Sequence, residues 1–166
     1  MTTRPIAALL VICLSFAVRS SADETKDKEK PRDARETVKA FVELAMDGKY
    51  EEAAKLGDPG QTPSQPKVVK DNFSKVKIEN FAVKSVHADD ANALAMSSKV
   101  KDDRGREGLL VFELVKKQDR WLIHDIDFEN DKSAKDELKR FLDKHPDAKV
   151  MPEKEKAKNG EKSDGN

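Results

Sequence analysis

The stretch Gly108–Asn130, GLLVFELVKKQDRWLIHDIDFEN, decides the fold that we predict for this chain. Apolar and polar residues alternate on both sides of Gln118 and Asp119, which is the pattern of two half-buried strands joined by a tight turn. Two earlier segments, Val76–Ala88 and Ala91–Lys101, have the same period and end at short polar turns. The four segments, with Gly108–Lys117 and Arg120–Glu129 as the last pair, predict an antiparallel meander of four or more strands.

Helical spacing flanks the predicted meander on both sides. Asp33 and Glu36 have the spacing of a capping box, and apolar residues then recur at i, i+3, i+4 and i+7. Two short helices are expected next, one with Tyr50 on its apolar side and one opened by Pro66. A last helix is expected from about Ser133. The predicted fold class is α+β, with the sheet packed on N-terminal helices and followed by a C-terminal helix.

The two ends of the chain differ in composition from its middle. Residues 1–22 hold two arginines and no acid around the apolar run Ile6–Val18, and end in Ser-Ser-Ala. These features predict a signal peptide, and a retained N-terminal anchor is the alternative. The charged segments 23–32 and 147–166 are predicted to be disordered, which leaves 33–146 as the domain. We therefore expect export to a periplasmic or extracellular space after cleavage near Ala22, with no stable membrane anchor.

Charge and cysteine content exclude several classes of function. The 32 Lys and Arg residues balance the 32 Asp and Glu residues, so the chain lacks the basic excess of a nucleic-acid-binding protein. Cys13 is the only cysteine and lies in the predicted signal peptide. A mature chain without a thiol has no disulfide, cysteine nucleophile or thiolate metal site. The acidic residues around Asp125–Asp136 lack the glycine of a calcium loop, so we expect neither a metal nor a cofactor.

A register for the predicted sheet follows if each hairpin closes on a two-residue turn. It places Glu113 opposite His124, Met96 opposite Glu113, and Val83 opposite Met96. One face is then almost wholly apolar and is expected against the N-terminal helices; it includes Leu94, Met96, Ser98, Val111, Glu113 and His124. The opposite, mixed face is expected to take the final helix, a second subunit or both; its apolar members include Ala93, Leu110, Phe112, Leu114 and Ile123.

The helix ending in MDGKYEEAAKL, the two short helices after it and the closing strand DRWLIHDIDFE resemble the nuclear-transport-factor-2-like superfamily, with its polyketide-cyclase-like and ketosteroid-isomerase-like relatives. The resemblance covers about Asp33 to Glu129. It implies a curved sheet wrapped around helices as a cone with a pocket at the open end. Enzymes of the superfamily place an acid–base carboxylate, histidine or tyrosine inside the cone. No catalytic motif of a single member matches this chain, so the resemblance carries fold and not chemistry.

Glu113 and His124 are the candidate site that the residues themselves indicate. A carboxylate beside an imidazole on an apolar wall can serve acid–base catalysis or bind the polar group of a ligand, but it can also be a purely structural ion pair. Tyr50, Met96 and Ser98 are candidate ligand-binding residues of the same cone. We expect an exported, non-catalytic module that binds a small apolar ligand or pairs with another protein chain through the mixed face, for instance as a homodimer. The alternatives are a small isomerase- or dehydratase-like enzyme that uses Glu113 and His124, and a purely structural domain with a collapsed cone.

Overall fold

The structure, a computed structural model, describes residues 32–152. The predicted signal peptide, nearly all of the linker 23–32 and residues 153–166 of the predicted tail lie outside the described residues. Among the described residues, no helix is both long enough and apolar enough to cross a membrane.

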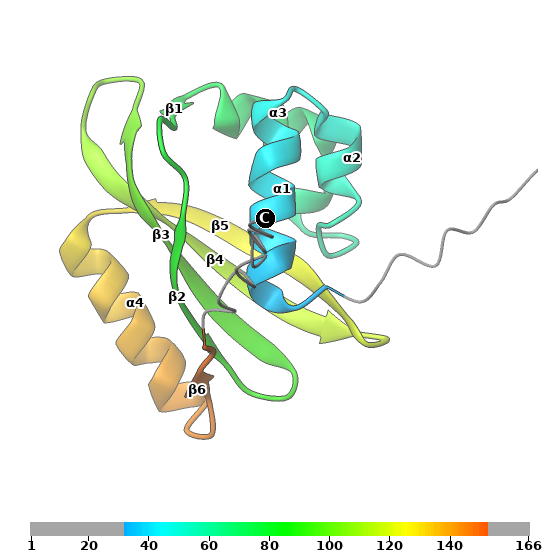
Figure 1. Ribbon diagram of the computed structural model, residues 1–166, viewed down its shortest axis with the longest axis vertical. Coiled ribbons are helices and arrows are strands. Elements are labelled where there is room, and N and C mark those ends of the chain that lie inside the picture. The colour runs from blue at the N-terminus through cyan, green and yellow to red at the C-terminus, as the bar shows by residue number, and fades with distance from the viewer. Residues whose placement is uncertain (1–31, 153–166) are drawn as a thin grey trace, which may run out of the picture. The chain divides into compact units, whose positions relative to one another are not determined.

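Helices form the first part of the domain, as the sequence predicted (Figure 1). The Asp33 carboxylate accepts a hydrogen bond from the Glu36 N–H at 2.8 Å, and the Glu36 side chain accepts one from the Asp33 N–H at 3.4 Å, so the capping box is confirmed. Gly48, with φ +74°, ends the first helix in the left-handed conformation that glycine tolerates. The elements are α1 (Ala34–Met46), α2 (Tyr50–Ala54), the short 3₁₀ helix η1 (Thr62–Ser64) and α3 (Pro66–Phe73).

The described residues then form one six-stranded antiparallel sheet with the order β5-β4-β3-β2-β6, in which β1 also pairs with β3. Gln118 and Asp119 have φ values of 51° and 60°, so the predicted two-residue turn of the last hairpin is confirmed. The strands are β1 (Val76–Lys77), β2 (Val83–Ala88), β3 (Asn92–Asp102), β4 (Glu107–Lys117), β5 (Arg120–Glu129) and β6 (Lys149–Val150), with α4 (Asp131–Lys144) between the last two.

Two predicted boundaries are wrong. The single strand expected at Val76–Ala88 is two strands, because the chain bends at Glu79 and Asn80 and leaves the ladder between β1 and β2. The second wrong boundary is the start of the tail, which the sequence analysis placed too early, at residue 147. Residues 149–150 form β6, which pairs with the end of β2, and the Met151 N–H donates to the Val86 carbonyl at 2.8 Å.

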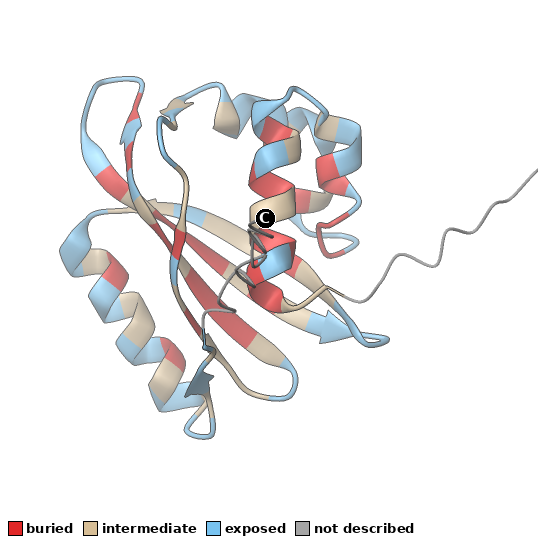
Figure 2. Cartoon of the chain, viewed as in Figure 1, coloured by how far each residue is buried: buried red, intermediate tan, exposed pale blue. Residues whose placement is uncertain are grey.

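Helices cover both faces of the sheet (Figures 1 and 2). The N-terminal helices and the C-terminal helix each lie on the face that was predicted for the other. Helices α1 to α3 share a core with the mixed face, whose buried members include Ala93, Leu110, Phe112, Leu114 and Ile123. Helix α4 covers the other face, where its buried residues pack with strand residues in a second cluster: Leu94, Val111, Ala134 and Phe141. The apolar side chains of the mixed face are therefore buried within the chain, against α1 to α3.

Three bulges explain why the predicted register failed. The pairing slips between Val83 and Ser85 on β2, between Met96 and Lys99 on β3, and at His124 on β5, opposite Glu113 and Leu114. Each slip changes which residues of a strand share a face. The observed partners are Glu113 with Asp125, Leu94 with Glu113, and Ser85 with Met96.

A buried arginine joins the first helix to strand β2 and to the segment after β6. Arg35 of α1 is 7% exposed, and its Nη1 donates to the Val83 carbonyl at 2.5 Å. Its Nη2 donates to the Met151 carbonyl at 3.4 Å. Because these carbonyls belong to β2 and to the segment after β6, the guanidinium joins α1, the sheet and the C-terminal end of the described chain.

Candidate functional site

A loop after α2 runs beside the last strand and brings an aspartate to the end of the sheet. The Ile123 N–H donates to the Leu56 carbonyl at 2.9 Å, and the Asp58 N–H donates to the Ile123 carbonyl at 2.7 Å. Gly57, between them, forms a parallel bridge with Ile123. A Cβ at Gly57 would lie 2.4 Å from the Pro63 carbonyl carbon, so glycine is required at this close approach.

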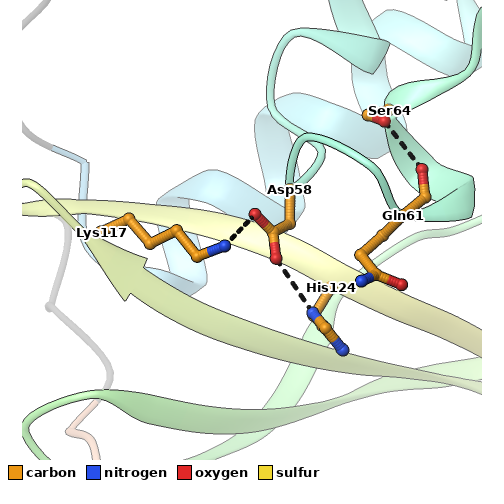
Figure 3. Close-up of polar contacts among 5 residues, drawn as sticks. All are labelled: Asp58, Gln61, Ser64, Lys117 and His124. Atoms are coloured by element: carbon orange, nitrogen blue, oxygen red, sulfur yellow. Dashed lines mark hydrogen bonds and ion pairs between the residues drawn. The ribbon is translucent and has the colours of Figure 1, made fainter.

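The Asp58 carboxylate joins this loop to both strands of the last hairpin (Figure 3). Asp58 is 2% exposed, and its Oδ1 accepts a bond from the Lys117 Nζ of β4 at 2.6 Å. Its Oδ2 lies 3.0 Å from the His124 Nδ1 of β5. The loop is held from the other side by η1, where the Gln61 N–H donates to the Asp58 carbonyl at 3.0 Å and the Ser64 hydroxyl donates to the Gln61 carbonyl at 2.7 Å.

These contacts set the protonation of the cluster. The hydrogen bond from Lys117 is the largest influence on Asp58; burial opposes it and the bond to His124 reinforces it, so the pKa of the Asp58 carboxyl lies below its usual value. Asp58 is therefore an anion near neutral pH and acts as an acceptor. The proton between the two side chains then belongs to Nδ1 of His124, and a neutral ring keeps its lone pair on Nε2.

Glu113 does not face His124 across the ladder, which corrects the predicted pair. The bulge at His124 places Asp125 opposite Glu113 and Ile123 opposite Leu114. Among residues 32–152, no hydrogen bond joins Glu113 to His124 or to another side chain. The ion pair expected from the sequence is wrong in its geometry, and His124 has Asp58 as its partner instead.

Glu113 and His124 nevertheless line one cavity of about 170 Å³ between the sheet and α4, which we call the α4 cavity. Burial raises the pKa of the Glu113 carboxyl, and the nearby charges of Glu137 and Asp125 raise it further. His124 and Lys144 oppose this shift without cancelling it. The other side chains that line the cavity include Asn92, Glu137, Phe141, Lys144 and His145.

His145 is held in the same way as His124. Its Nδ1 lies 2.8 Å from Oδ2 of Asp89, at the turn between β2 and β3. Its ring packs on Phe141, with the ring centroids 4.6 Å apart. Burial raises the pKa of the Asp89 carboxyl, but the Ala91 and Asn92 N–H groups and His145 outweigh burial, so that this pKa lies below its usual value. Two histidines of the α4 cavity thus each point Nδ1 at an ionised aspartate.

The three predicted ligand-binding residues do not meet in one cavity. Tyr50 packs against the core of α1–α3, whereas Met96 packs with the cluster under α4, on the other face of the sheet. Ser98 lies at the bulge of β3, where its hydroxyl accepts from the Ala82 N–H at 3.1 Å and donates to the Asn80 carbonyl at 2.9 Å. These contacts give Ser98 a structural task, which is to satisfy backbone groups where the ladder is interrupted.

A second cavity, of about 270 Å³, lies between α3, β1 and the adjoining ends of β3, β4 and β5; we call it the apolar cavity. Its apolar lining is Phe73, Val76, Leu110, Ile126 and Phe128. Its polar lining includes Asp102 and Arg106, whose Oδ2 and Nε atoms are 2.6 Å apart. The sequence placed each apolar residue on an element, but only the packing of α3 over the sheet brings them together.

Sequence reasoning missed Asp58, Lys117 and the pair of Asp89 with His145. Asp58 stands in the stretch GDPGQTPSQP, which has the composition of an ordinary loop. No local pattern marks Asp58 as a site residue, because its position depends on the long-range contact of its loop with β5. No group of three or more His, Cys, Asp or Glu side chains within 32–152 is placed to hold a metal ion.

The fold and the site define an α+β domain in which a curved antiparallel sheet lies between N-terminal helices and a C-terminal helix. No protein-family model and no curated protein matches the chain. A solved structure of a designed protein with the nuclear-transport-factor-2 fold is similar at 16% identity and a TM-score of 0.47, over 57% of this chain and 95% of that chain. At that score the likeness carries no argument, and the architecture rests on the elements described above.

Replacing Asp58 by Asn should make the free energy of unfolding depend less on pH in the acidic range. The pKa of Asp58 is lower in the folded state than in the unfolded chain, where it is about 4. The carboxylate therefore stabilises the fold when the pH is above the unfolded-state pKa, and this stabilisation is lost as the pH falls through the folded-state pKa. We expect Asp58→Asn to lose about 1–3 kcal/mol of unfolding free energy at neutral pH. Its loss of stability on acidification should be smaller than that of the wild type. Urea unfolding at a series of pH values measures both effects.

The matched control is Asp90→Asn, which changes an exposed carboxylate in the turn between β2 and β3. It should follow the wild-type curve within ~0.5 kcal/mol. If the unfolding free energy of Asp58→Asn also changes with pH in the same way as that of the wild type, the charge of Asp58 does not hold the loop to the hairpin.

Proposed function

We propose that this domain binds a small, mainly apolar ligand in the apolar cavity. The observation that carries the proposal is a lining of five apolar side chains with an Asp–Arg pair at the same opening. Ligand sites of soluble domains combine an apolar wall with a few polar groups that fix orientation. At about 270 Å³, the cavity is slightly smaller than the usual ligand pocket of ~300–1,000 Å³, so it suits a small ligand. The element order that the resemblance implied is compatible with a pocket at this end of the sheet.

Arg106 and Asp102 give the cavity its polar edge. The Asp102 carboxylate accepts the Arg104 and Arg106 N–H groups at 3.0 and 2.8 Å as well as the Arg106 side chain. Burial raises the pKa of Asp102, but the hydrogen bonds and charge from Arg106, with the bond from Arg104, lower it overall. The Arg106 side chain is 68% exposed and bonds Asp102 through Nε. A polar group on the ligand would meet this edge while its apolar part lies against the phenylalanines.

Filling the apolar cavity should weaken binding of an apolar probe. Indole is a suitable probe, and saturation-transfer NMR would measure its binding to the mature protein. Val76→Trp places a large side chain into the lining, so we expect indole affinity to fall about ten-fold or more, the effect of ~1.4 kcal/mol.

Val150→Trp is the matched control, because Val150 is 64% exposed and lies in β6 outside the lining. This variant should bind indole as the wild type does, and thermal unfolding should show that both variants are folded. Equal affinity in the three proteins, or no binding to the wild type, would rule out the apolar cavity as the ligand site.

Acid–base catalysis at the α4 cavity is the second candidate function, and the position of His124 favours it. A buried aspartate that holds Nδ1 of a histidine leaves Nε2 as a base, and Glu113 lines the same cavity as a carboxyl with a raised pKa. This arrangement would suit removal of a proton beside a carbonyl group, the first step of an isomerase- or dehydratase-like reaction.

Proton exchange tests that second candidate without a known substrate. Wild-type protein in D₂O should accelerate loss of the α-proton signals of cyclohexanone, followed by ¹H NMR, and His124→Gln should abolish the acceleration. A rate equal to that of buffer alone, or unchanged in His124→Gln, would refute catalysis of this proton transfer by the pair.

We further propose that the domain is exported, on the basis of the composition of residues 1–22. Protein purified from its own host should have the mass of a chain that starts at Asp23. A variant with Leu in place of both Ser20 and Ala22 should keep the first 22 residues, because the small side chains of the cleavage site are lost. A wild-type chain that starts at Met1 would overturn the proposed cleavage and leave the retained anchor as the alternative.

A further inference from the structure

The α4 cavity presents more hydrogen-bond acceptors than donors. His124 and His145 each direct Nδ1 to a carboxylate whose pKa is lowered, Asp58 and Asp89 respectively. The carboxylates are anions near neutral pH, so the Nδ1 atoms carry the protons. With Nδ1 as the donor, a ring that carries a single proton has its lone pair on Nε2, and no hydrogen bond within 32–152 uses either Nε2 atom.

The carboxylates of the cavity add to this excess. Glu113 is half-buried and accepts no hydrogen bond within the described residues, although an isolated buried carboxylate is costly. Glu137, from α4, has an ion pair with Arg140 on its own helix. Asp125, opposite Glu113 on β5, adds a further negative charge near the cavity.

The positive groups that face the cavity are few. Lys144 ends α4 and is exposed; it lowers the pKa of Glu113 by its charge, but no ion pair joins the two within the described residues. Asn92, from β3, contributes an amide. Lys117 is bound to Asp58. None of these groups supplies the buried counter-charge that Glu113 lacks.

We propose that the α4 cavity binds a small organic ammonium ion, with Glu113 as its counter-ion and Nε2 of His124 and His145 as acceptors. An ammonium group has up to three N–H donors and one positive charge, which matches two lone pairs and a carboxylate. A cavity of about 170 Å³ is smaller than the ~300–1,000 Å³ of usual ligand pockets, so the ligand is a short amine. This inference goes beyond the ligand binding proposed for the apolar cavity, because it assigns a ligand class to the cavity on the other face of the sheet.

The titration of Glu113 in the mature protein tests the proposal directly. Carboxyl ¹³C signals would be followed against pH with ethylammonium chloride and, separately, with sodium chloride at equal ionic strength. Ethylammonium should bring the pKa of Glu113 down towards its ordinary value, because the bound cation stabilises the carboxylate, and sodium should do so less. A Glu113 titration that does not change, or that changes equally in both salts, would overturn the site, since general screening explains the second result.

A pair of variants gives an independent test. Glu113→Gln removes the counter-ion and should weaken ethylammonium binding about ten-fold or more, as measured by saturation-transfer NMR. Glu107→Gln, on the same strand but exposed and paired with Lys99, should leave that binding unchanged. Unchanged binding in Glu113→Gln would contradict the proposal.

Indole binding, measured on the same samples, separates the two cavities. Both glutamate variants should bind indole normally, because neither residue lines the apolar cavity. Loss of ammonium binding with normal indole binding supports this inference. A protein that binds indole but no ethylammonium overturns the ammonium site alone, whereas one that binds ethylammonium but no indole overturns the apolar site alone.

Discussion

The pairing of β4 with β5 is the constraint on which the rest of the domain depends. The ladder starts in regular register at the turn and slips by one residue at His124. Before the slip, Leu114 and Ile123 contribute to the core with α1–α3; after it, Ile126 and Phe128 join that core although their spacing from Ile123 is odd. One extra residue therefore lets a single strand keep large apolar side chains against the same helices over its whole length. It also turns His124 to the end of the sheet, where Asp58 holds it.

Asp58 holds the side chain of His124, the residue at which the pairing of β4 with β5 slips. Its loop reaches β5 through backbone bonds to Ile123, and its carboxylate then bonds Lys117 and His124 on the two strands of one hairpin. Such a buried anion is tolerable because Lys117 pairs with its charge at one oxygen and His124 hydrogen-bonds the other. The arrangement makes Nδ1 the hydrogen-bonded nitrogen of His124, which also lines the α4 cavity. The core of α1–α3 and that cavity thus share one anchoring group, although they lie on opposite faces of the sheet.

Local patterns predicted much of the fold, whereas the long-range contacts could not be predicted from them. The capping box at Asp33, the stop at Gly48 and the turn at Gln118-Asp119 depend on neighbours in sequence, and each is confirmed. The predicted facing of the sheet failed because the register assumed unbroken pairing from each turn, whereas each bulge reverses the facing of the residues beyond it. The candidate site failed in part for a similar reason. Glu113 and His124 do line one cavity, but the true partner of His124 lies 66 residues away in a Gly- and Pro-rich loop.

The two outer strands of the sheet have one property in common. Beside β5, the segment Leu56–Asp58 occupies backbone groups of Ile123, and beside β2, the residues from Lys149 to Met151 occupy those of Val86 to Ala88. Exposed strand edges invite a further chain to add to the sheet, and proteins commonly cover them. Here the chain covers part of each edge with its own backbone. Over those stretches the backbone groups of Ile123 and of Val86 to Ala88 are already bonded within the chain, so they are not available to a further strand.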